Sequence, residues 1–242
     1  MNKLDKKVMI ADGKAKQIFT TNDPELVWIH SKNQATALNG KRKVQIEDKG
    51  YYTNQISGRL FEYLTKKGIK NHFVEAVNDT DVISKRLTMI PLEVVTRNYA
   101  SGHFVTKYAV KPMIHLVPPV QEFYYKSDEL DDPMINESQI EALNILNADQ
   151  LAYISAEALK INDLLKVIFA DMNIRLVDFK VEFGFDIHNN IILGDELSPD
   201  NMRIVDETTG KSLDKDIFRK NLGSLTAVYD DVLNRLKKEL GE

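Results

Sequence analysis

The most informative absence in this chain of 242 residues is cysteine, of which there is none. Disulfides, thiolate catalysis, zinc fingers and iron–sulfur clusters are therefore excluded together. Glycine and proline are also scarce, at 11 and 7 residues, which argues against a collagen-like or disordered chain. No apolar run approaches the ~20 residues that a membrane helix needs, so we expect a cytoplasmic protein without a membrane partner.

The chain also lacks a strong excess of one charge. Lys and Arg together number 32 and Asp and Glu 36, which gives a formal net charge of −4. Nucleic-acid-binding domains are usually clearly basic, so we expect no nucleic-acid partner, although local basic clusters can still bind a small anion. A chain of this length can bury a full core, either as one large domain or as two closely packed lobes.

The first third of the chain alternates short β-like runs with turns. Asp12-Gly13 is typical of a hairpin turn, and further turns are predicted at Asn39-Gly40 and Lys49-Gly50. The apolar spacing over 56–64 fits a short helix. The predicted strands cover residues 8–10, 17–20, 26–30, 74–77 and 82–87.

A natural break in the pattern falls at Pro91, which cannot donate to a sheet ladder and keeps Ile90 extended. We therefore expect a β-rich lobe over 1–89 and a second lobe over 90–242 that combines helices with a sheet. The chain as a whole is expected to be α+β, with a cleft between the lobes. In the second lobe, apolar periodicity predicts helices over 151–172 and 225–236 and strands over 92–96, 176–187 and 191–195.

The segment from Val177 to Phe183 alternates apolar and charged residues without a slip. The period of a strand puts Asp178, Lys180 and Glu182 on one face and the apolar residues in the core. Such a charged face is often simply solvated, and that interpretation competes with a functional one.

The strand that follows favours the functional interpretation. If Asn189-Asn190 forms a two-residue turn, Gly184 lies opposite Asp195, and Asp195 is diagonal to Glu182 on the same face. Two carboxylates there could hold one Mg²⁺ ion and leave positions open for phosphate oxygens. A slip of one residue would send Asp195 to the other face, so this register is an explicit expectation.

Basic residues at two other places suit an anionic ligand. Gly13-Lys14-Ala15-Lys16 could grip a polyphosphate, although it is not a Walker A loop and a solvated hairpin is the commoner explanation. The loop that begins at Arg97 contains Ser101 and His103, and Arg203 follows the predicted metal strand. Arginine suits bidentate phosphate capture. His103 could contact a ligand, but the preferred interpretation is an ordinary loop histidine.

At these residues the chain resembles the SAICAR synthetase family, whose members are phosphoribosylaminoimidazole-succinocarboxamide synthases. The resemblance extends over nearly the whole chain in the family's order. The matching segments are Gly13–Lys16, Ile90–Asn98, Asp132–Glu137, Val177–Gly184, Gly194–Asp200 and Asp214–Arg219.

The resemblance implies a reaction and a fold. ATP, L-aspartate and carboxyaminoimidazole ribonucleotide (CAIR) would give ADP, phosphate and SAICAR, with Mg²⁺ and through an acyl phosphate on the CAIR carboxylate. It also implies a β-rich, somewhat kinase-like ATP lobe over 1–89, packed on an α+β lobe over 90–242, and a homodimer.

The resemblance further implies a role for each matching residue. Asp178 and Lys180 would lie around the imidazole nucleotide, and Mg²⁺ would be held by Glu182 and Asp195. The expected catalytic residues are Asp178, Lys180 and Glu182. ATP would be bound by the turn Gly13, Lys14, Ala15 and Lys16 and by the hinge from Met89 to Leu92. The ribose phosphate would be bound by Arg97, Ser101, His103 and Arg203.

The chain departs from the family pattern at His103, where the family commonly has a phosphate-binding serine. A histidine can also donate to phosphate, more strongly when protonated. An aromatic residue common in the family is replaced by Val205. The aspartate site is not readable, because Lys41-Arg42-Lys43 could attract a dicarboxylate but a charge run is more often a solvated loop.

Two other functions stay open at this point. A small-molecule kinase would share the lysines, the carboxylates and the cleft. A non-catalytic nucleotide-binding regulator would not need converging acids, so it would be favoured if Asp195 faced away from Glu182.

Overall fold

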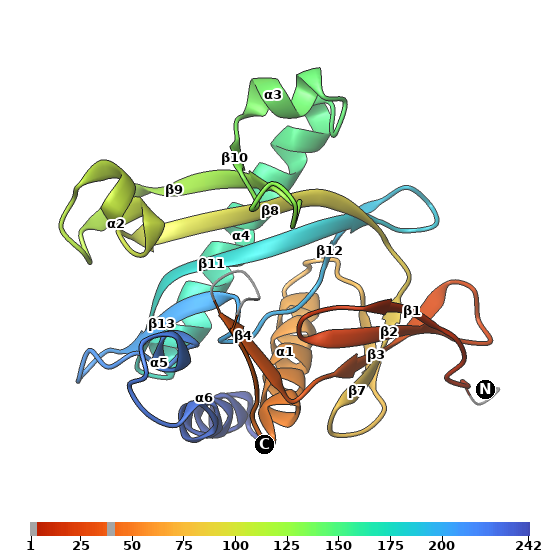
Figure 1. The fold of residues 1–242 in the computed structure, drawn as a ribbon, viewed down its shortest axis with the longest axis horizontal. Coiled ribbons are helices and arrows are strands. Elements are labelled where there is room, and N and C mark those ends of the chain that lie inside the picture. The colour runs from red at the N-terminus through yellow and green to blue at the C-terminus, as the bar shows by residue number, and fades with distance from the viewer. Residues whose placement is uncertain (1–3, 38–41) are drawn as a thin grey trace.

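Two separate antiparallel sheets organise the chain in its computed structural model, which describes residues 4–37 and 42–242 (Figure 1). The first sheet has the strand order β1-β2-β3-β7-β6. Its strands are β1 (Met9–Asp12), β2 (Lys16–Thr20), β3 (Leu26–Ser31), β6 (Phe73–Ala76) and β7 (Asp81–Lys85). A separate pair is formed by β4 (Gln34–Ala37) and β5 (Arg42–Gln45).

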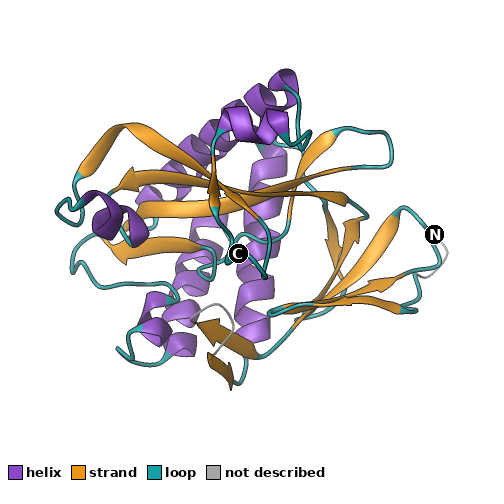
Figure 2. Ribbon diagram, turned by 45° about the horizontal axis from the view of Figure 1, so that its top comes forward, coloured by secondary structure: helices purple, strands orange, loops and turns teal. Residues whose placement is uncertain are grey.

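The second sheet has the order β10-β9-β8-β11-β12, and β13 also pairs with β11. Helices pack against this sheet (Figure 2). Its strands are β8 (Thr88–Tyr99), β9 (His115–Tyr125), β10 (Met134–Ile135), β11 (Ile174–Phe185), β12 (Ile191–Gly194) and β13 (Met202–Asp206). The helices are α1 (Lys49–Lys66), α2 (His103–Tyr108), α3 (Glu137–Ala142), α4 (Ala148–Asp171), α5 (Asp216–Arg219) and α6 (Leu225–Leu240).

The hairpin predicted around Asp12-Gly13 is confirmed. β1 and β2 pair with Asp12 opposite Gln17, and the Gly13 amide donates to the Lys16 carbonyl at 2.9 Å. The other strands predicted in the first third of the chain are present as β3, β6 and β7, with ends shifted by one or two residues. The turn predicted at Asn39-Gly40 lies outside the described residues.

The turn predicted at Lys49-Gly50 is wrong, because helix α1 begins there. A Cβ atom on Gly50 would lie only 2.6 Å from the Ser31 carbonyl oxygen. Gly50 therefore serves a close approach of the helix to the end of β3 rather than a turn. The helix is also longer than its apolar spacing indicated, at 18 residues.

The predicted break at Pro91 is also wrong, because β8 runs through it as one strand of 12 residues. The pairing of β8 with β11 shifts register between Glu182 and Gly184, opposite this point. A proline is tolerated at such an irregularity, since no ladder donor is required of it there. The chain passes from the first sheet to the second between Lys85 and Thr88.

One hydrophobic core joins both halves of the chain. It includes Leu60 of α1, Leu165 of α4 and Leu236 of α6, all buried. The sheets are also tied through β12, where the Leu193 carbonyl accepts from the His72 amide at 2.9 Å. The mixture of helices and antiparallel strands is the predicted α+β class. None of the described helices is both long and apolar enough to cross a membrane.

Candidate active site

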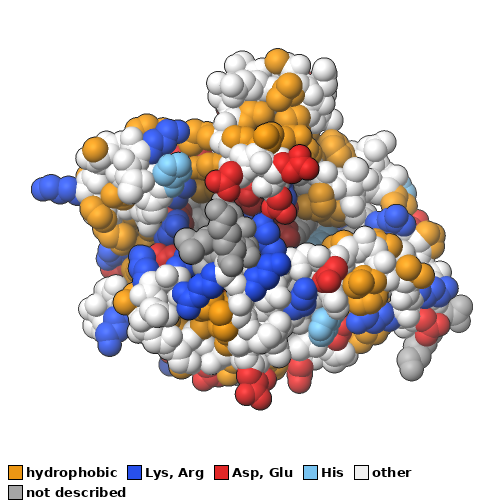
Figure 3. Space-filling model, viewed as in Figure 1, with side chains coloured by type: hydrophobic (Ala, Val, Ile, Leu, Met, Phe, Trp, Pro, Cys, Tyr) orange, Lys and Arg blue, Asp and Glu red, His pale blue; other side chains and the backbone are white. Residues whose placement is uncertain are grey.

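A cavity of about 1010 Å³ lies between the two sheets. On the face shown in Figure 3, acidic and basic side chains gather around the hollow. The walls come from both sheets and from the loops after β9 and β12. This volume is at the upper end of the range for ligand pockets, so it has room for more than one small molecule.

The charged face of β11 forms part of the cavity wall. Asp178, Lys180 and Glu182 all line it, and the alternate residues Val177 and Val181 are buried in the core. Asp178 and Glu182 are each only 3% exposed. The solvated face is therefore the wrong interpretation, and carboxylates buried this deeply require charged partners.

The register predicted between β11 and β12 is wrong by three residues. Glu182, and not Gly184, lies nearest the end of β12, directly opposite Gly194. The predicted two-residue turn is instead a longer loop, in which the Asp186 carboxylate accepts from the amides of His188 and Asn190. The sequence pattern did not reveal that a side chain would close this loop.

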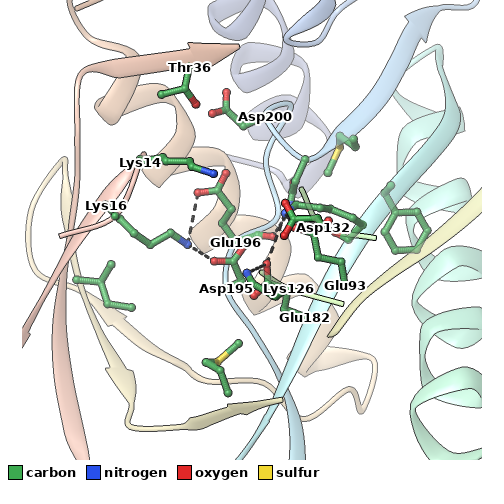
Figure 4. A pocket seen from close by; sticks show the side chains of 18 of the residues that line it. Lys14, Lys16, Thr36, Glu93, Lys126, Asp132, Glu182, Asp195, Glu196 and Asp200 are labelled. Atoms are coloured by element: carbon green, nitrogen blue, oxygen red, sulfur yellow. Dashed lines mark hydrogen bonds and ion pairs between the residues drawn. The ribbon is translucent and has the colours of Figure 1, made fainter. Parts of the chain in front are cut away.

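Asp195 nevertheless reaches Glu182, by a different route. It follows the last residue of β12 and has a positive φ of 60°, which turns the chain towards the cavity. Such a conformation is uncommon for a residue other than glycine and is typical of functional sites. Figure 4 shows the two side chains close together. Because these acids converge, the non-catalytic regulator loses the observation that would have favoured it.

Ammonium groups surround the two carboxylates. Lys16 Nζ lies 2.6 Å from Asp195 Oδ1 and 3.5 Å from Glu196 Oε2, and Lys126 Nζ lies 2.5 Å from Glu182 Oε1 (Figure 4). Two chain segments distant in sequence thus place cations at one point. The site balances its acidic pair with basic side chains that are also able to contact phosphate oxygens.

The two carboxylates differ in their protonation behaviour. Burial and repulsion by Asp195 raise the pKa of Glu182. Burial also opposes ionisation of Asp195, but attraction to Lys16 and Lys180 outweighs it and lowers the pKa of Asp195. Burial lowers the pKa of Lys180, but Glu182 and Glu93 outweigh this effect and raise it. These opposite shifts are typical of groups arranged around a reaction centre.

The donor set fits a Mg²⁺ ion. Glu182 and Asp195 supply carboxylate oxygens, which this cation prefers, and Mg²⁺ commonly takes only one or two protein carboxylates together with phosphates and water. No group of three or more acidic or histidine side chains able to hold a metal occurs within residues 4–37 and 42–242. A bound phosphate would therefore supply part of the coordination.

The glycine–lysine turn lies at the cavity, but its two lysines differ. Gly13 and Ala15 line the cavity beside them. The Lys16 side chain is 17% exposed and points inward, whereas the Lys14 side chain is 45% exposed and pairs with Asp128 at 2.7 Å. Lys16 is therefore at the centre of the site, and Lys14 is at its rim.

One part of the cavity wall is apolar and comes largely from the first sheet. The predicted hinge residue Met89 lines it, whereas the Leu92 side chain is buried in the core and does not. Any contact of Leu92 with a ligand would have to come from its backbone. The apolar residues lining the cavity include Ile10, Ile18, Val27, Leu87 and Met202.

A row of alternating charges crosses the second sheet at the cavity floor. Arg97 Nη1 donates to Asp178 Oδ2 at 2.7 Å, and Arg203 Nη1 donates to the same oxygen at 3.0 Å. Arg97 is 5% exposed, whereas the Arg203 side chain is 26% exposed. Both predicted arginines thus line the cavity, but Arg203 is the more accessible.

The loop after β8 contacts Arg203 through Gly102. This glycine has a φ of 52°, and a Cβ atom on it would lie 2.6 Å from Arg203 Nη2. Only glycine therefore fits here. Ser101 and His103, on either side of it, do not line the cavity, and His103 is exposed at the start of α2. Of this predicted phosphate loop, the glycine alone has a defined contact with the arginine.

Other residues of the cavity were missed. Glu93 pairs with Lys180, and Lys126 pairs with Glu182. Period 2 could have found Glu93, because Glu93, Val95 and Arg97 line the cavity as alternate residues of β8. Lys126 follows β9, a strand that the analysis of the sequence did not predict.

A second group of charged residues that the sequence did not predict supports the loop after β12. Asp200 lines the cavity and has lysines on two sides, with Lys49 Nζ at 2.7 Å and Lys215 Nζ at 3.0 Å. The hydroxyl of Tyr229 also donates to Asp200 at 2.7 Å. This network anchors the segment between Asp195 and Arg203, and no local pattern in the sequence indicates it.

The basic run Lys41-Arg42-Lys43, considered above as a site for a dicarboxylate, has no described residue in the cavity wall. Lys41 lies outside the described residues. Arg42 lies over the Phe218 ring, with its guanidinium carbon 4.4 Å from the ring centre. Neither Arg42 nor Lys43 lines the cavity.

Comparison with known proteins gives one consistent result. The family model for SAICAR synthetase matches residues 9–236. The chain is 52% identical to phosphoribosylaminoimidazole-succinocarboxamide synthase of Lactiplantibacillus plantarum, over 96% of each chain. Its fold matches the crystal structure of the Ehrlichia chaffeensis synthase with a TM-score of 0.93 and 42% identity, covering 95% of this chain and 98% of that one. A SAICAR synthetase in complex with ADP matches with a TM-score of 0.91 and 38% identity, covering 94% and 97%.

Proposed function

The chain belongs to the SAICAR synthetase family of ATP-dependent ligases of purine biosynthesis, and from this premise we propose that it joins L-aspartate to the carboxylate of CAIR. The products are SAICAR, ADP and phosphate. The family resemblance also implies a homodimer in the cytoplasm, which we include in the proposal.

The observation that carries this proposal is the meeting of Glu182 and Asp195 between two sets of cations. On one side Lys16 comes from the first sheet, and on the other Arg203 comes from the second. A site for transfer between a nucleoside triphosphate and a phosphorylated acceptor needs this arrangement, because both substrates carry anionic groups towards one centre.

ATP binds on the side of the first sheet in this proposal. The adenine contacts the apolar wall near Met89, and Lys16 contacts the phosphates, with Lys14 closing over them at the rim. ADP is the ligand of the related SAICAR synthetase structure, which supports nucleotide binding in this cavity. Mg²⁺, held by Glu182 and Asp195, neutralises phosphate charge when bound.

CAIR binds on the side of the second sheet. Arg203 contacts its ribose phosphate, since the guanidinium is partly exposed and held by Asp178 and Gly102. Asp178 and Lys180 lie beside the imidazole ring and its carboxylate. The acceptor carboxylate is thereby directed towards the γ-phosphate of ATP. Orientation of this kind removes much of the barrier of a reaction between two bound molecules.

The chemistry then proceeds in two steps. A carboxylate is a poor acyl donor, because its leaving group would be oxide. An oxygen of the CAIR carboxylate attacks the γ-phosphorus, the bond to ADP breaks, and an acyl phosphate forms. The amine of aspartate attacks the acyl carbon, releases a proton and expels phosphate, which leaves the amide. Lys16 and Lys180 neutralise the anionic groups during both steps.

A coupled ADP-release assay tests this proposal. With ATP and Mg²⁺ present, we expect sustained ADP release only when CAIR and aspartate are both added, with one SAICAR formed per ADP. Sustained release with CAIR alone would instead indicate a small-molecule kinase. Failure of CAIR and aspartate to stimulate ADP release would contradict the proposed function.

A further inference from the structure

We propose that Glu122, which has no part in the function proposed above, is a positioning residue that orients Arg97 for CAIR binding. Glu122 lies on β9, outside the row of residues on β11 that faces the substrates. It is buried beside Arg97, which lines the cavity, with only 7% of its surface exposed. The proposal rests on the proposed function, because it takes the ligand of Arg97 to be the same nucleotide substrate that Arg203 contacts there.

Glu122 contacts one edge of the Arg97 guanidinium through a single carboxylate oxygen. Its Oε2 atom accepts from Arg97 Nε at 2.8 Å and lies 2.8 Å from Arg97 Nη2. A single carboxylate oxygen thus contacts two nitrogens of the guanidinium, while Arg97 Nη1 donates to Asp178. These contacts fix the plane of the guanidinium from two sides.

The sheet itself places Glu122 in this position. Arg97 pairs with Val120 across the β8–β9 ladder, and Val95 pairs with Glu122, so Glu122 is the diagonal neighbour of Arg97. Diagonal neighbours lie on one face of a sheet, within reach of long side chains. Asp178 lies directly opposite Arg97 on the other side, across the β8–β11 ladder.

Tyr124 holds Glu122 in turn. Its hydroxyl donates to Glu122 Oε2 at 2.9 Å. Burial lowers the pKa of Arg97, whereas attraction to Asp178 and Glu122 raises it. The attraction is the stronger effect, so the pKa is raised. The guanidinium therefore stays charged, and its orientation is the property that Glu122 controls.

The row from Glu122 through Arg97 and Asp178 reaches Arg203, whose Nε atom also lies 3.7 Å from Asp216 Oδ2. Asp178 Oδ2 accepts from both arginines, so a shift of Arg97 is passed to the carboxylate that holds Arg203. Two buried acids and two arginines balance in charge. A phosphate at this floor is therefore recognised by directed N–H groups rather than by an excess of positive charge.

This distinction gives the proposal a sharp test. If only charge mattered, removing the Glu122 carboxylate would strengthen binding of the anionic CAIR. If Glu122 positions Arg97, the Glu122→Gln variant binds CAIR at least about tenfold more weakly. We expect its affinity for ATP to change by less than about twofold. CAIR and ATP dissociation constants are measured separately by calorimetry, beside a melting curve.

Two further variants complete the experiment. Glu157→Gln changes a glutamate that is equally buried but pairs with Lys160 on α4, and we expect unchanged CAIR affinity. Tyr124→Phe removes one hydrogen bond to Glu122, and we expect CAIR affinity to fall about twofold to fivefold. It also keeps the test available should Glu122→Gln fail to fold, because unchanged CAIR affinity in Tyr124→Phe would then overturn the proposal.

The outcomes separate this inference from the proposed function. CAIR affinity in Glu122→Gln that is unchanged or higher would overturn the positioning role, as would an equal loss of ATP and CAIR affinity with a lower melting temperature. If the wild-type protein does not bind CAIR, the proposed function fails before the variants are compared.

Discussion

The two sides of the cavity hold their charges in different ways. On the side of the first sheet, Lys14 and Lys16 extend from a hairpin turn, and Lys14 is nearly half exposed. On the side of the second sheet, Glu122, Arg97 and Asp178 interlock across neighbouring strands and are almost wholly buried. The first arrangement suits a flexible polyphosphate, and the second suits a rigid nucleotide that must be aimed.

The two sides therefore separate two tasks, holding a substrate by charge and orienting it by directed hydrogen bonds. Lysine is a compact charge on a flexible stem, whereas arginine is a planar fork that keeps a direction. The acidic pair of Glu182 and Asp195 lies where these two sides meet. Substitutions should therefore affect both substrates at this pair, but only one substrate on either side.

The largest effect is expected at the meeting point. Glu182→Gln and Asp195→Asn should each lower kcat at least about 100-fold, because charge neutralisation of the transferred phosphoryl group is lost. Steady-state assays with a Mg²⁺ titration measure this, and circular dichroism checks that the fold persists. Glu207→Gln is the control, since Glu207 pairs with Arg175 at the surface. Full activity in either variant would contradict the metal assignment.

The next effect separates the two lysines of the turn. Lys16→Met should raise the KM for ATP about thirtyfold, because Lys16 is buried against Asp195, whereas Lys14→Met should raise it about threefold or less. The KM for CAIR should change little in both. Equal effects of the two substitutions would show that the difference in exposure has no functional meaning.

A tenfold effect is expected on the opposite side. Arg203→Ala should raise the KM for CAIR about tenfold and the KM for ATP less than about twofold, since one charged hydrogen-bonding group to phosphate is removed. Arg175→Ala serves as the control, because Arg175 lies on the same strand as Asp178 but pairs with the surface residue Glu207. An unchanged KM for CAIR in Arg203→Ala would refute this role.

The last effect is on stability rather than on substrate binding, and concerns the support of the second side. Asp214 accepts from the amides of Ile204 and Asp216, and burial raises its pKa to about 6 from 3.8. The folded protein thus keeps a proton that the unfolded chain releases, so the contribution of Asp214 to stability is present below pH 4 and is lost as the pH rises through 6.

Asp214→Asn removes this titration. From pH 4 to pH 7 the free energy of unfolding of the wild type should fall by about 2–3 kcal/mol relative to that of the variant. Urea unfolding at several pH values measures the difference. Parallel curves for the two proteins would contradict the raised pKa.

Much of the fold could be predicted because period and turn chemistry act locally. The alternation in β11 and the apolar stripe of α4 each require only one segment of chain. The predictions at Pro91 and Gly50 were wrong because the roles of these residues depend on partners distant in sequence. The irregular pairing with β11 accommodates Pro91, and the end of β3 explains Gly50.

The candidate site was predictable where residues alternate on a strand, as Asp178, Lys180 and Glu182 do. Its partners were not. The register of β12 was wrong because Asp186 closes a longer loop, and Asp195 arrives through a positive φ that no pattern reveals. Lys126 lies just after β9 and Glu122 lies on it, and both meet their partners only when the strands assemble into the sheet.

The central claim is that ATP and CAIR meet at Glu182 and Asp195, so that phosphate passes directly to the CAIR carboxylate. CAIR labelled with ¹⁸O in that carboxylate tests it, with the released phosphate analysed by mass spectrometry. Transfer through an acyl phosphate carries one carboxylate oxygen into each phosphate, so the account predicts one ¹⁸O per phosphate formed. Phosphate without ¹⁸O, released together with SAICAR, would contradict it.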